Sequence, residues 1–247
     1  MDRRNATTAV IGAGDFIGSA IARKFAAEGF TVLAGRRNGE KLTPLVNDIE
    51  AAGGRVIGRS LDARKEDEVI GFLQVADSEA PLEVCIFNIG ANVHFPLVET
   101  TERVFRKVWE MACHAGFLTV RESARLMLPH GRGAIFVTGA TASLRGGAGY
   151  AAFAAAKAGL RAVAQSAARE LGPKNIHVAH LVIDAGVDTA WVRERIRTRE
   201  GDAALRELPP DRLMRPSSVA DAYWALYQQP RDAWTFEMDI RPFGEKW

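Results

Sequence analysis

Residues 10–29 read VIGAGDFIGSAIARKFAAEG, an apolar run followed by a glycine-rich turn and a stretch with the apolar spacing of a helix. Gly12 and Gly14 allow a tight turn and the close backbone approach that a pyrophosphate needs. Gly18 allows the helix to pack on the strand, and the N-terminus of that helix favours phosphates. The stretch predicts a dinucleotide site rather than a purely structural turn, with contacts from Gly12, Gly14, Phe16, Ile17 and Gly18.

The alternation of strand and helix continues along the chain. Short apolar or β-branched runs lie at 7–12, 31–35, 55–61, 83–90, 133–140, 176–183 and 236–242. Stretches with helical spacing lie at 17–28, 39–52, 65–77, 100–127, 150–171 and 217–228. This alternation predicts an α/β fold, a Rossmann-like, doubly wound parallel sheet with helices on both faces. Because 247 residues without a repeat or linker suit one domain, we predict a single NAD(P)-binding domain over residues 1–247.

The charge of the chain is nearly balanced, with 32 Lys and Arg against 30 Asp and Glu and a formal net charge of +2. Without a clustered basic patch, this balance argues against nucleic acid as a partner. The densest basic stretch, WVRERIRTRE at 191–200, also contains acids. It favours a solvated surface helix over an anion site.

The two cysteines, Cys85 and Cys113, lack the spacing of a metal or redox motif, so we expect free thiols and no metal site. No window approaches ~18 uncharged apolar residues, and the apolar run at the N-terminus is too short for a signal peptide. We therefore expect a cytoplasmic protein with no membrane partner.

The end of the second apolar run, TVLAGRRN, bears on the choice of nucleotide. A carboxylate at this position would hold the ribose diol of NAD, but Arg36 and Arg37 stand there instead. Guanidinium groups suit a 2′-phosphate, which predicts NADP(H) in preference to NAD(H). Asp15 in the glycine-rich turn argues against this preference, because its negative charge would face the same region as the phosphate. The alternative is that Arg36 and Arg37 are ordinary exposed side chains of a surface turn.

Further motifs extend the pattern over nearly the whole chain: SLDA at 60–63, FNIGAN at 87–92, GYAAFAAAKAG at 149–159 and VDTAW at 187–191. With the glycine-rich turn, they resemble those of the short-chain dehydrogenase/reductase family. The resemblance implies a sheet of about seven strands, a small-molecule substrate, a homodimer or homotetramer built on the two long middle helices, and a small substrate-lid segment near 188–212. It also implies cofactor contacts from Asp62, Asn88, Gly90, Lys157 and Thr189.

The same resemblance exposes substitutions in the reaction centre. The family uses an Asn, Ser, Tyr and Lys tetrad, and aligning on GYAAFAAAK places its lysine at Lys157 and its tyrosine at Phe153. The serine position falls at Ala140 and the asparagine position at Cys113. Phenylalanine has no proton to donate and alanine has no hydroxyl, so the usual mechanism cannot operate unchanged.

Three nearby residues are candidate replacements in catalysis. Tyr150 shares a helical face with Phe153 and Lys157, but it lies about 10 Å along the axis from Lys157 and is as well suited to lining the pocket wall. Ser143 follows Ala140 in a loop, where donating to a substrate and capping the next segment are both plausible. His94 lies in the loop after the fourth strand, where a histidine suits a general acid, with a place in the pocket wall as the alternative.

Two polar residues near the sixth strand have open roles. His180 lies inside that strand and is most simply a core residue, while Asp184 either orients a substrate or shapes a turn. Phe95, Tyr150, Phe153 and Trp191 imply an apolar, aromatic pocket.

The sequence thus predicts an NADP(H)-dependent oxidoreductase acting on a small hydrophobic carbonyl or alcohol with an atypical proton donor. A nucleotide-binding scaffold or sensor without chemistry is the alternative. Hydride addition to an activated C=C or C=N bond, with a proton from water, is a third possibility.

Overall fold

The computed structural model describes residues 3–245, so the ends of the predicted domain, residues 1–2 and 246–247, lie outside the described residues. Seven strands form one sheet in the order β3-β2-β1-β4-β5-β6-β7, and every pairing is parallel. The strands are β1 (Thr7–Ile11), β2 (Thr31–Arg36), β3 (Arg55–Ser60), β4 (Leu82–Phe87), β5 (Gly133–Thr138), β6 (Ile176–Ile183) and β7 (Glu237–Ile240). The predicted doubly wound parallel sheet is confirmed.

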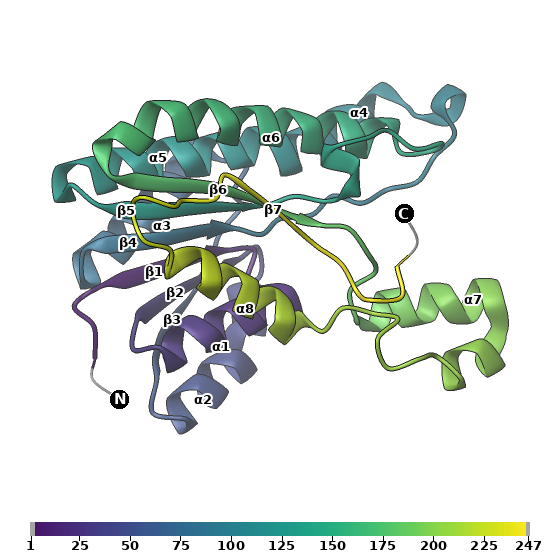
Figure 1. Ribbon diagram of the computed structural model, residues 1–247, viewed down its shortest axis with the longest axis horizontal. Helices are drawn as coiled ribbons and strands as arrows, with labels where there is room; N and C mark the ends of the chain where they lie inside the picture. Colours follow the sequence, from purple (N-terminus) through teal and green to yellow (C-terminus); the bar gives the residue numbers. More distant parts are fainter. Residues whose placement is uncertain (1–2, 246–247) are drawn as a thin grey trace.

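Helices cover both faces of this sheet (Figure 1). One face carries α1 (Ile17–Ala27), α2 (Thr43–Ala51) and α8 (Pro216–Tyr227), and the other carries α3 (Glu66–Glu79), α5 (Ala115–His130) and α6 (Ala151–Leu171). The central strands are buried on both faces, because each face is sealed by its own helix layer. This burial explains why the strands appear in the sequence as continuous apolar runs.

Helical boundaries differ from the sequence prediction in two places. The stretch 39–52 begins as a 3-10 turn at Gly39–Leu42 before α2 starts. The stretch predicted as one helix over 100–127 is α4 (Glu102–Trp109), a π-helical turn at Glu110–His114 and then α5. A π turn takes one extra residue, which the periodicity of apolar residues does not reveal.

One helix stands apart from the two layers. Helix α7 (Ala190–Arg206) extends beside the carboxyl ends of the strands in Figure 1, and none of its residues is buried. Gly201, with φ of +89°, interrupts it. Val187 pairs with Met214, so the predicted lid segment near 188–212 leaves and rejoins the body of the domain at adjacent points. Within residues 3–245, no helix is long and apolar enough to cross a membrane.

Candidate active site and cofactor cleft

The order of the strands reverses direction between β1 and β4, and the glycine-rich turn lies at this switch point. Gly12 has φ of +93°, and a Cβ there would lie 2.7 Å from the backbone oxygen of Asn88. The Asn88 amide nitrogen Nδ2 donates to the Gly12 oxygen at 3.1 Å. Only glycine suits both this backbone conformation and this close approach. The turn after β1 is therefore fixed directly against the end of β4.

Two further glycines of this turn differ in their surroundings. A Cβ on Gly18 would lie 2.2 Å from the oxygen of Gly12, so the helix α1 packs on the turn without room for a side chain. A Cβ on Gly14 would meet nothing within 4 Å, because that position opens into the cleft. The first turn of α1 contains no acidic residue. A close-packed helix N-terminus beside an open backbone surface fits the pyrophosphate of a dinucleotide.

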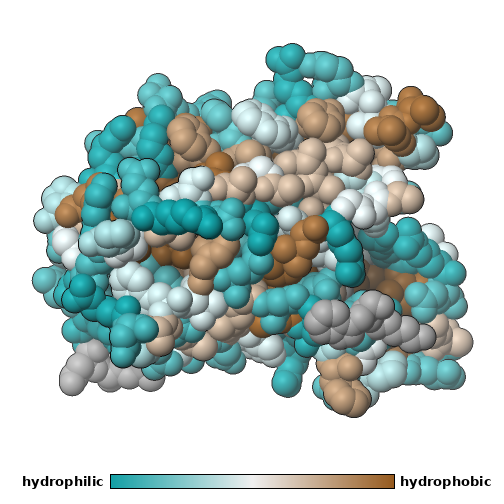
Figure 2. Space-filling view, turned by 45° about the horizontal axis from the view of Figure 1, so that its top comes forward, coloured by the Kyte–Doolittle hydropathy of each residue, from teal (hydrophilic) through white to brown (hydrophobic). Residues whose placement is uncertain are grey.

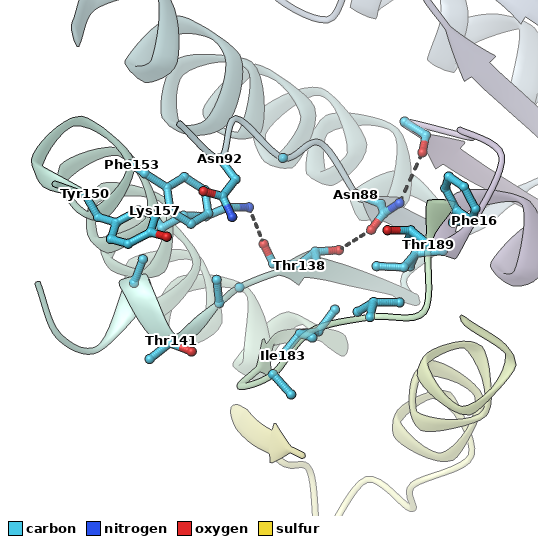
Figure 3. Close-up of a pocket in the computed structure, with 18 of the residues that line it drawn as sticks. Phe16, Asn88, Asn92, Thr138, Thr141, Tyr150, Phe153, Lys157, Ile183 and Thr189 are labelled. Atoms are coloured by element: carbon cyan, nitrogen blue, oxygen red, sulfur yellow. Dashed lines mark hydrogen bonds between the residues drawn. The ribbon is translucent and has the colours of Figure 1, made fainter. Parts of the chain in front are cut away.

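Two adjoining cavities follow this edge of the sheet. The larger, about 660 Å³, lies over the glycine-rich turn and the helix α6, and Figure 3 shows its lining. The smaller, about 550 Å³, lies at the ends of β2 and β3. Ten predicted site residues line the larger cavity: Gly12, Gly14, Phe16, Ile17, Gly18, Asn88, Gly90, Tyr150, Lys157 and Thr189. Arg36, Arg37 and Asp62 line the smaller one, which shares Gly12, Gly14, Asn88 and Gly90 with the larger.

The charged groups of the smaller cavity are partly paired with one another. Arg36 donates to the Asp15 carboxylate at 2.6 Å. The negative charge of Asp15, which disfavours a nucleotide phosphate, is therefore already paired with a guanidinium. Arg37 is exposed beside it. Asp62 receives two hydrogen bonds from the Arg64 guanidinium, at 2.8 and 2.6 Å, and these hold the pKa of Asp62 below its usual range. A second guanidinium thus neutralises the carboxylate at the end of β3.

A chain of hydrogen bonds ties the floor of the larger cavity together (Figure 3). The Thr138 hydroxyl donates its one proton to the Asn88 side-chain oxygen at 3.0 Å. The Tyr223 hydroxyl lies 2.6 Å from the Thr138 hydroxyl and must therefore be the donor of that second hydrogen bond. Tyr223 is fully buried, and burial raises the pKa of its phenol beyond the usual range. Thr138 and Tyr223 were not predicted as site residues, because neither lies in a recognisable motif.

Lys157 enters the same floor from α6. Its ammonium donates to the Thr138 oxygen at 2.7 Å and to the Ile89 oxygen at 3.1 Å. The side chain is 2% exposed, and burial lowers its pKa to about 8. A charged lysine inside an alanine-rich helix therefore projects into the cavity and does not reach across the surface to bulk solvent.

The three candidate proton donors occupy different environments. Tyr150 lines the larger cavity, and its hydroxyl oxygen accepts a hydrogen bond from Arg195 at 2.8 Å. His94 is exposed and packs edge-on against the Tyr150 ring, with ring centroids 4.8 Å apart. Ser143 is buried, and its hydroxyl accepts from the Ala140 amide at 3.1 Å within a 3-10 turn. Tyr150 alone of these three lines the larger cavity.

Phe153 and its neighbours form an apolar wall. Phe153 is 7% exposed and belongs to a small cluster with Cys113, Ala112 and Ala156, and it also lines the larger cavity. Burial raises the pKa of the Cys113 thiol, so the thiol is held as a neutral apolar group. Ala140 packs against the same cluster. Phe153 and Ala140 therefore present carbon atoms to this side of the larger cavity.

Asp184 lies at the end of β6, in a network that the sequence did not reveal. The Thr141 hydroxyl donates to its carboxylate, and Arg241 lies 3.4 Å from the second carboxylate oxygen. Arg145, which lines the larger cavity, lies 4.0 Å away. These partners come from distant parts of the chain, so no local pattern marks them. Within residues 3–245, no cluster of three metal-ligating side chains occurs.

Comparison with known proteins agrees with this geometry. The family model for short chain dehydrogenases matches residues 6–200. The 3-oxoacyl-(acyl-carrier-protein) reductase MabA of Mycobacterium bovis is 30% identical over 215 residues, covering 85% of this chain and 81% of that protein. A crystal structure of a short-chain dehydrogenase from Rhodopseudomonas palustris is 67% identical, with a TM-score of 0.84 over 97% of this chain and 100% of that chain.

A metagenomic short-chain oxidoreductase in complex with NADP is 25% identical, with a TM-score of 0.79 over 97% of this chain and 98% of that chain. A family model that spans most of the chain, together with the seven-stranded parallel sheet, leaves no doubt about the class. The chain belongs to the short-chain dehydrogenase family and is an oxidoreductase.

Proposed function

We propose that this enzyme is an NADP(H)-dependent oxidoreductase that reduces a small hydrophobic carbonyl compound, or oxidises the corresponding alcohol. The observation that carries the proposal is that Tyr150 and Lys157 line the same cavity as the glycine-rich turn. The hydroxyl and the ammonium therefore face one space, where a substrate can meet a nucleotide. The exposed Arg37 and the paired Arg36 in the adjoining cavity support the phosphorylated form of the nucleotide.

The residues of the cleft divide the tasks of the reaction. Bound NADPH would supply the hydride that reaches the carbonyl carbon. Tyr150 donates its phenolic proton to the carbonyl oxygen, and Arg195, which already donates to that phenol oxygen, stabilises the phenolate that remains. Solvent returns the proton. Lys157 holds its position through two backbone oxygens and offers its third N–H to the ribose of the nucleotide.

Tyr150 takes the role of proton donor because Phe153 offers none. The family tyrosine corresponds to Phe153, whose ring belongs to an apolar cluster. One helical turn away, Tyr150 keeps its own proton free, since its oxygen acts as the acceptor toward Arg195. Ser143 is engaged with the Ala140 amide and His94 packs edge-on against the Tyr150 ring, so both contribute by holding this loop and ring.

NADPH oxidation with a panel of aldehydes, ketones and quinones tests the function. We expect turnover by the wild type and a loss of ~10²–10⁴-fold in kcat for Tyr150→Phe. Turnover that Tyr150→Phe leaves unchanged would show that the donor is another group, while the oxidoreductase function stands. Turnover by Phe153→Tyr together with none by the wild type would favour the nucleotide-binding scaffold instead.

The proposal includes a homodimer or homotetramer built on the two long middle helical stretches, which are α4 with α5 and α6. Phe105, Trp109 and Phe117 are exposed by 43%, 42% and 41%, which is unusual for large apolar side chains on neighbouring helices. In Figure 2, apolar and small side chains gather over the layer that contains these helices. Light scattering of the wild type and of Trp109→Lys tests this, and a wild-type monomer would contradict it.

A further inference from the structure

Arg195 differs from the other cations of α7 in its partners. Arg193 pairs with Asp188 at 2.5 Å, and Arg197 pairs with Glu194 on the solvent side of the helix. Among residues 3–245, no carboxylate lies within ion-pairing distance of Arg195, although its side chain is half-buried. Its guanidinium instead lies over the Trp191 ring, 5.6 Å from the centroid, and donates to Tyr150. A partly desolvated guanidinium with spare donors is a site for an anion.

The position of Arg195 connects this cation with the reaction cavity. A cavity of about 470 Å³ under α7 is lined by Trp191 and Arg195. It shares four lining residues with the larger cavity: Asn92, Ala185, Val187 and Thr189. Since Arg195 also reaches Tyr150, its guanidinium stands where the two cavities meet. A group bound there would lie beside the proton donor of the proposed function.

The balance of charge around this junction is positive. Besides Arg195, the cavity under α7 is lined by the cations Arg199 and Arg212 and by the acids Glu200 and Glu245. Arg212 already pairs with Glu245 at 3.2 Å. Arg145 lies at the edge of the larger cavity, where the Asp184 carboxylate 4.0 Å away offsets its charge. A negatively charged group is therefore attracted to this end of the cleft, away from the turn that suits the nucleotide phosphates.

We propose that Arg195 binds a carboxylate of the substrate, so that the enzyme acts on an oxo acid or hydroxy acid with an apolar body. The proposal rests on the proposed function and narrows its substrate class. The planar guanidinium matches the two oxygens of a carboxylate, and its single charge neutralises that of a monoanion. The apolar body would lie against Phe153 and Ile183, which line the adjacent wall. The assignment departs from the expected solvated helix at Arg195 alone, since Arg193, Arg197 and Arg199 are exposed as expected.

A matched pair of probes tests the assignment through turnover. Benzoylformate and its methyl ester share a ketone and a ring but differ in charge. We expect the wild type with NADPH to prefer the acid in kcat/KM, and Arg195→Gln to lose about 10- to 100-fold on the acid relative to the ester. Arg197→Gln, two residues along the same helix and outside the cavities, should keep the wild-type ratio. An unchanged acid-to-ester ratio in Arg195→Gln would overturn the assignment.

A binding measurement separates this inference from the proposed function. Phenylacetate and phenylacetamide undergo no hydride transfer, and Trp191 beside Arg195 reports on their binding through its fluorescence, read as the difference from Trp191→Phe. We expect the wild type to bind phenylacetate at least about tenfold more tightly than the amide, and Arg195→Gln to bind both equally. Equal binding by the wild type overturns the carboxylate site even if ketones are reduced. Tighter binding of phenyl phosphate than of phenylacetate would overturn the choice of carboxylate in favour of a phosphate.

Discussion

The Arg36 guanidinium donates to the Asp15 carboxylate across 2.6 Å, which joins the end of β2 to the glycine-rich turn. This pair offsets the charge that made Asp15 unfavourable for a 2′-phosphate, and it leaves Arg37, together with Lys41, as an exposed cation of the cavity. We expect Arg37→Gln to weaken NADPH binding by about 10- to 100-fold, because a hydrogen bond to a charged group contributes ~1.5–3 kcal/mol. NADH lacks the 2′-phosphate, so its dissociation constant should not change.

Calorimetric titration with both nucleotides measures this effect. Asp15→Asn serves as the companion variant, since it releases Arg36 from an exposed pair worth only ~0–1 kcal/mol. It should tighten NADPH binding by no more than about fivefold. A wild type that binds NADH and NADPH equally would contradict the preference for the phosphorylated nucleotide.

The glycines of the first turn give a second prediction. Gly18→Ala would place a Cβ 2.2 Å from a backbone oxygen, so we expect the free energy of unfolding to fall by ~1–3 kcal/mol or more. Gly14→Ala meets nothing within 4 Å and should preserve stability, yet its methyl group enters the cleft and should weaken NADPH binding by about tenfold. Urea unfolding and nucleotide titration of both variants separate the two roles. Equal stabilities for the two variants would show that the packing of α1 on the turn is looser than described.

The fold was predictable from sequence because the central strands are buried on both faces and the helices that pack on the sheet bury one face, so the local pattern reflects the layers directly. The residues predicted to contact the nucleotide line two adjoining cavities, since the carboxyl ends of parallel strands share one edge of the sheet. The π turn at Glu110–His114 was missed because it changes the backbone without changing the pattern of apolar residues.

The substrate end of the cleft was less predictable, for a physical reason. Tyr150 and Arg195 are 45 positions apart, and the stretch that contains Arg195 alternates acids and bases like any solvated helix. Nothing local shows which arginine turns inward, because that depends on where the bridge between Val187 and Met214 sets α7. The contacts around Asp184 could not be predicted for the same reason, since Thr141 and Arg241 come from distant parts of the chain.

Lys157 gives a prediction for the pH dependence of nucleotide binding. Burial lowers its pKa to about 8, so the ammonium of the free enzyme loses its proton as the pH rises through that value. The charged form binds an anionic nucleotide better than the neutral amine, and NADPH affinity should therefore fall above about pH 8. Lys157→Gln should bind about 10- to 100-fold more weakly at neutral pH and lose this alkaline fall. An identical alkaline fall in Lys157→Gln would assign the titration to another group.

His180 gives the last prediction, which concerns stability in acid. Its ring is fully buried in β6, with Nδ1 3.0 Å from a Glu237 oxygen. Glu237 is in turn held by Arg161, which keeps the pKa of Glu237 below its usual range. The carboxylate thus accepts from Nδ1–H of a neutral imidazole. On the other side, a Cβ on Gly139 would lie 2.2 Å from His180 Nε2, so the backbone of the cavity floor rests directly on the ring.

Burial lowers the pKa of His180 from 6.5 to about 4. Between these values the unfolded chain binds a proton that the folded chain does not, so acidification favours unfolding and the stability present above about pH 6.5 is lost as the pH falls toward 4. A shift of this size corresponds to about 3 kcal/mol, which should separate wild type from His180→Gln when urea unfolding at about pH 7.5 is compared with about pH 4.5. The neighbouring buried His177 is present in both proteins and cancels in the comparison. Equal losses of stability in the two proteins would mean that His180 is protonated in the folded state, with its charge balanced by Glu237.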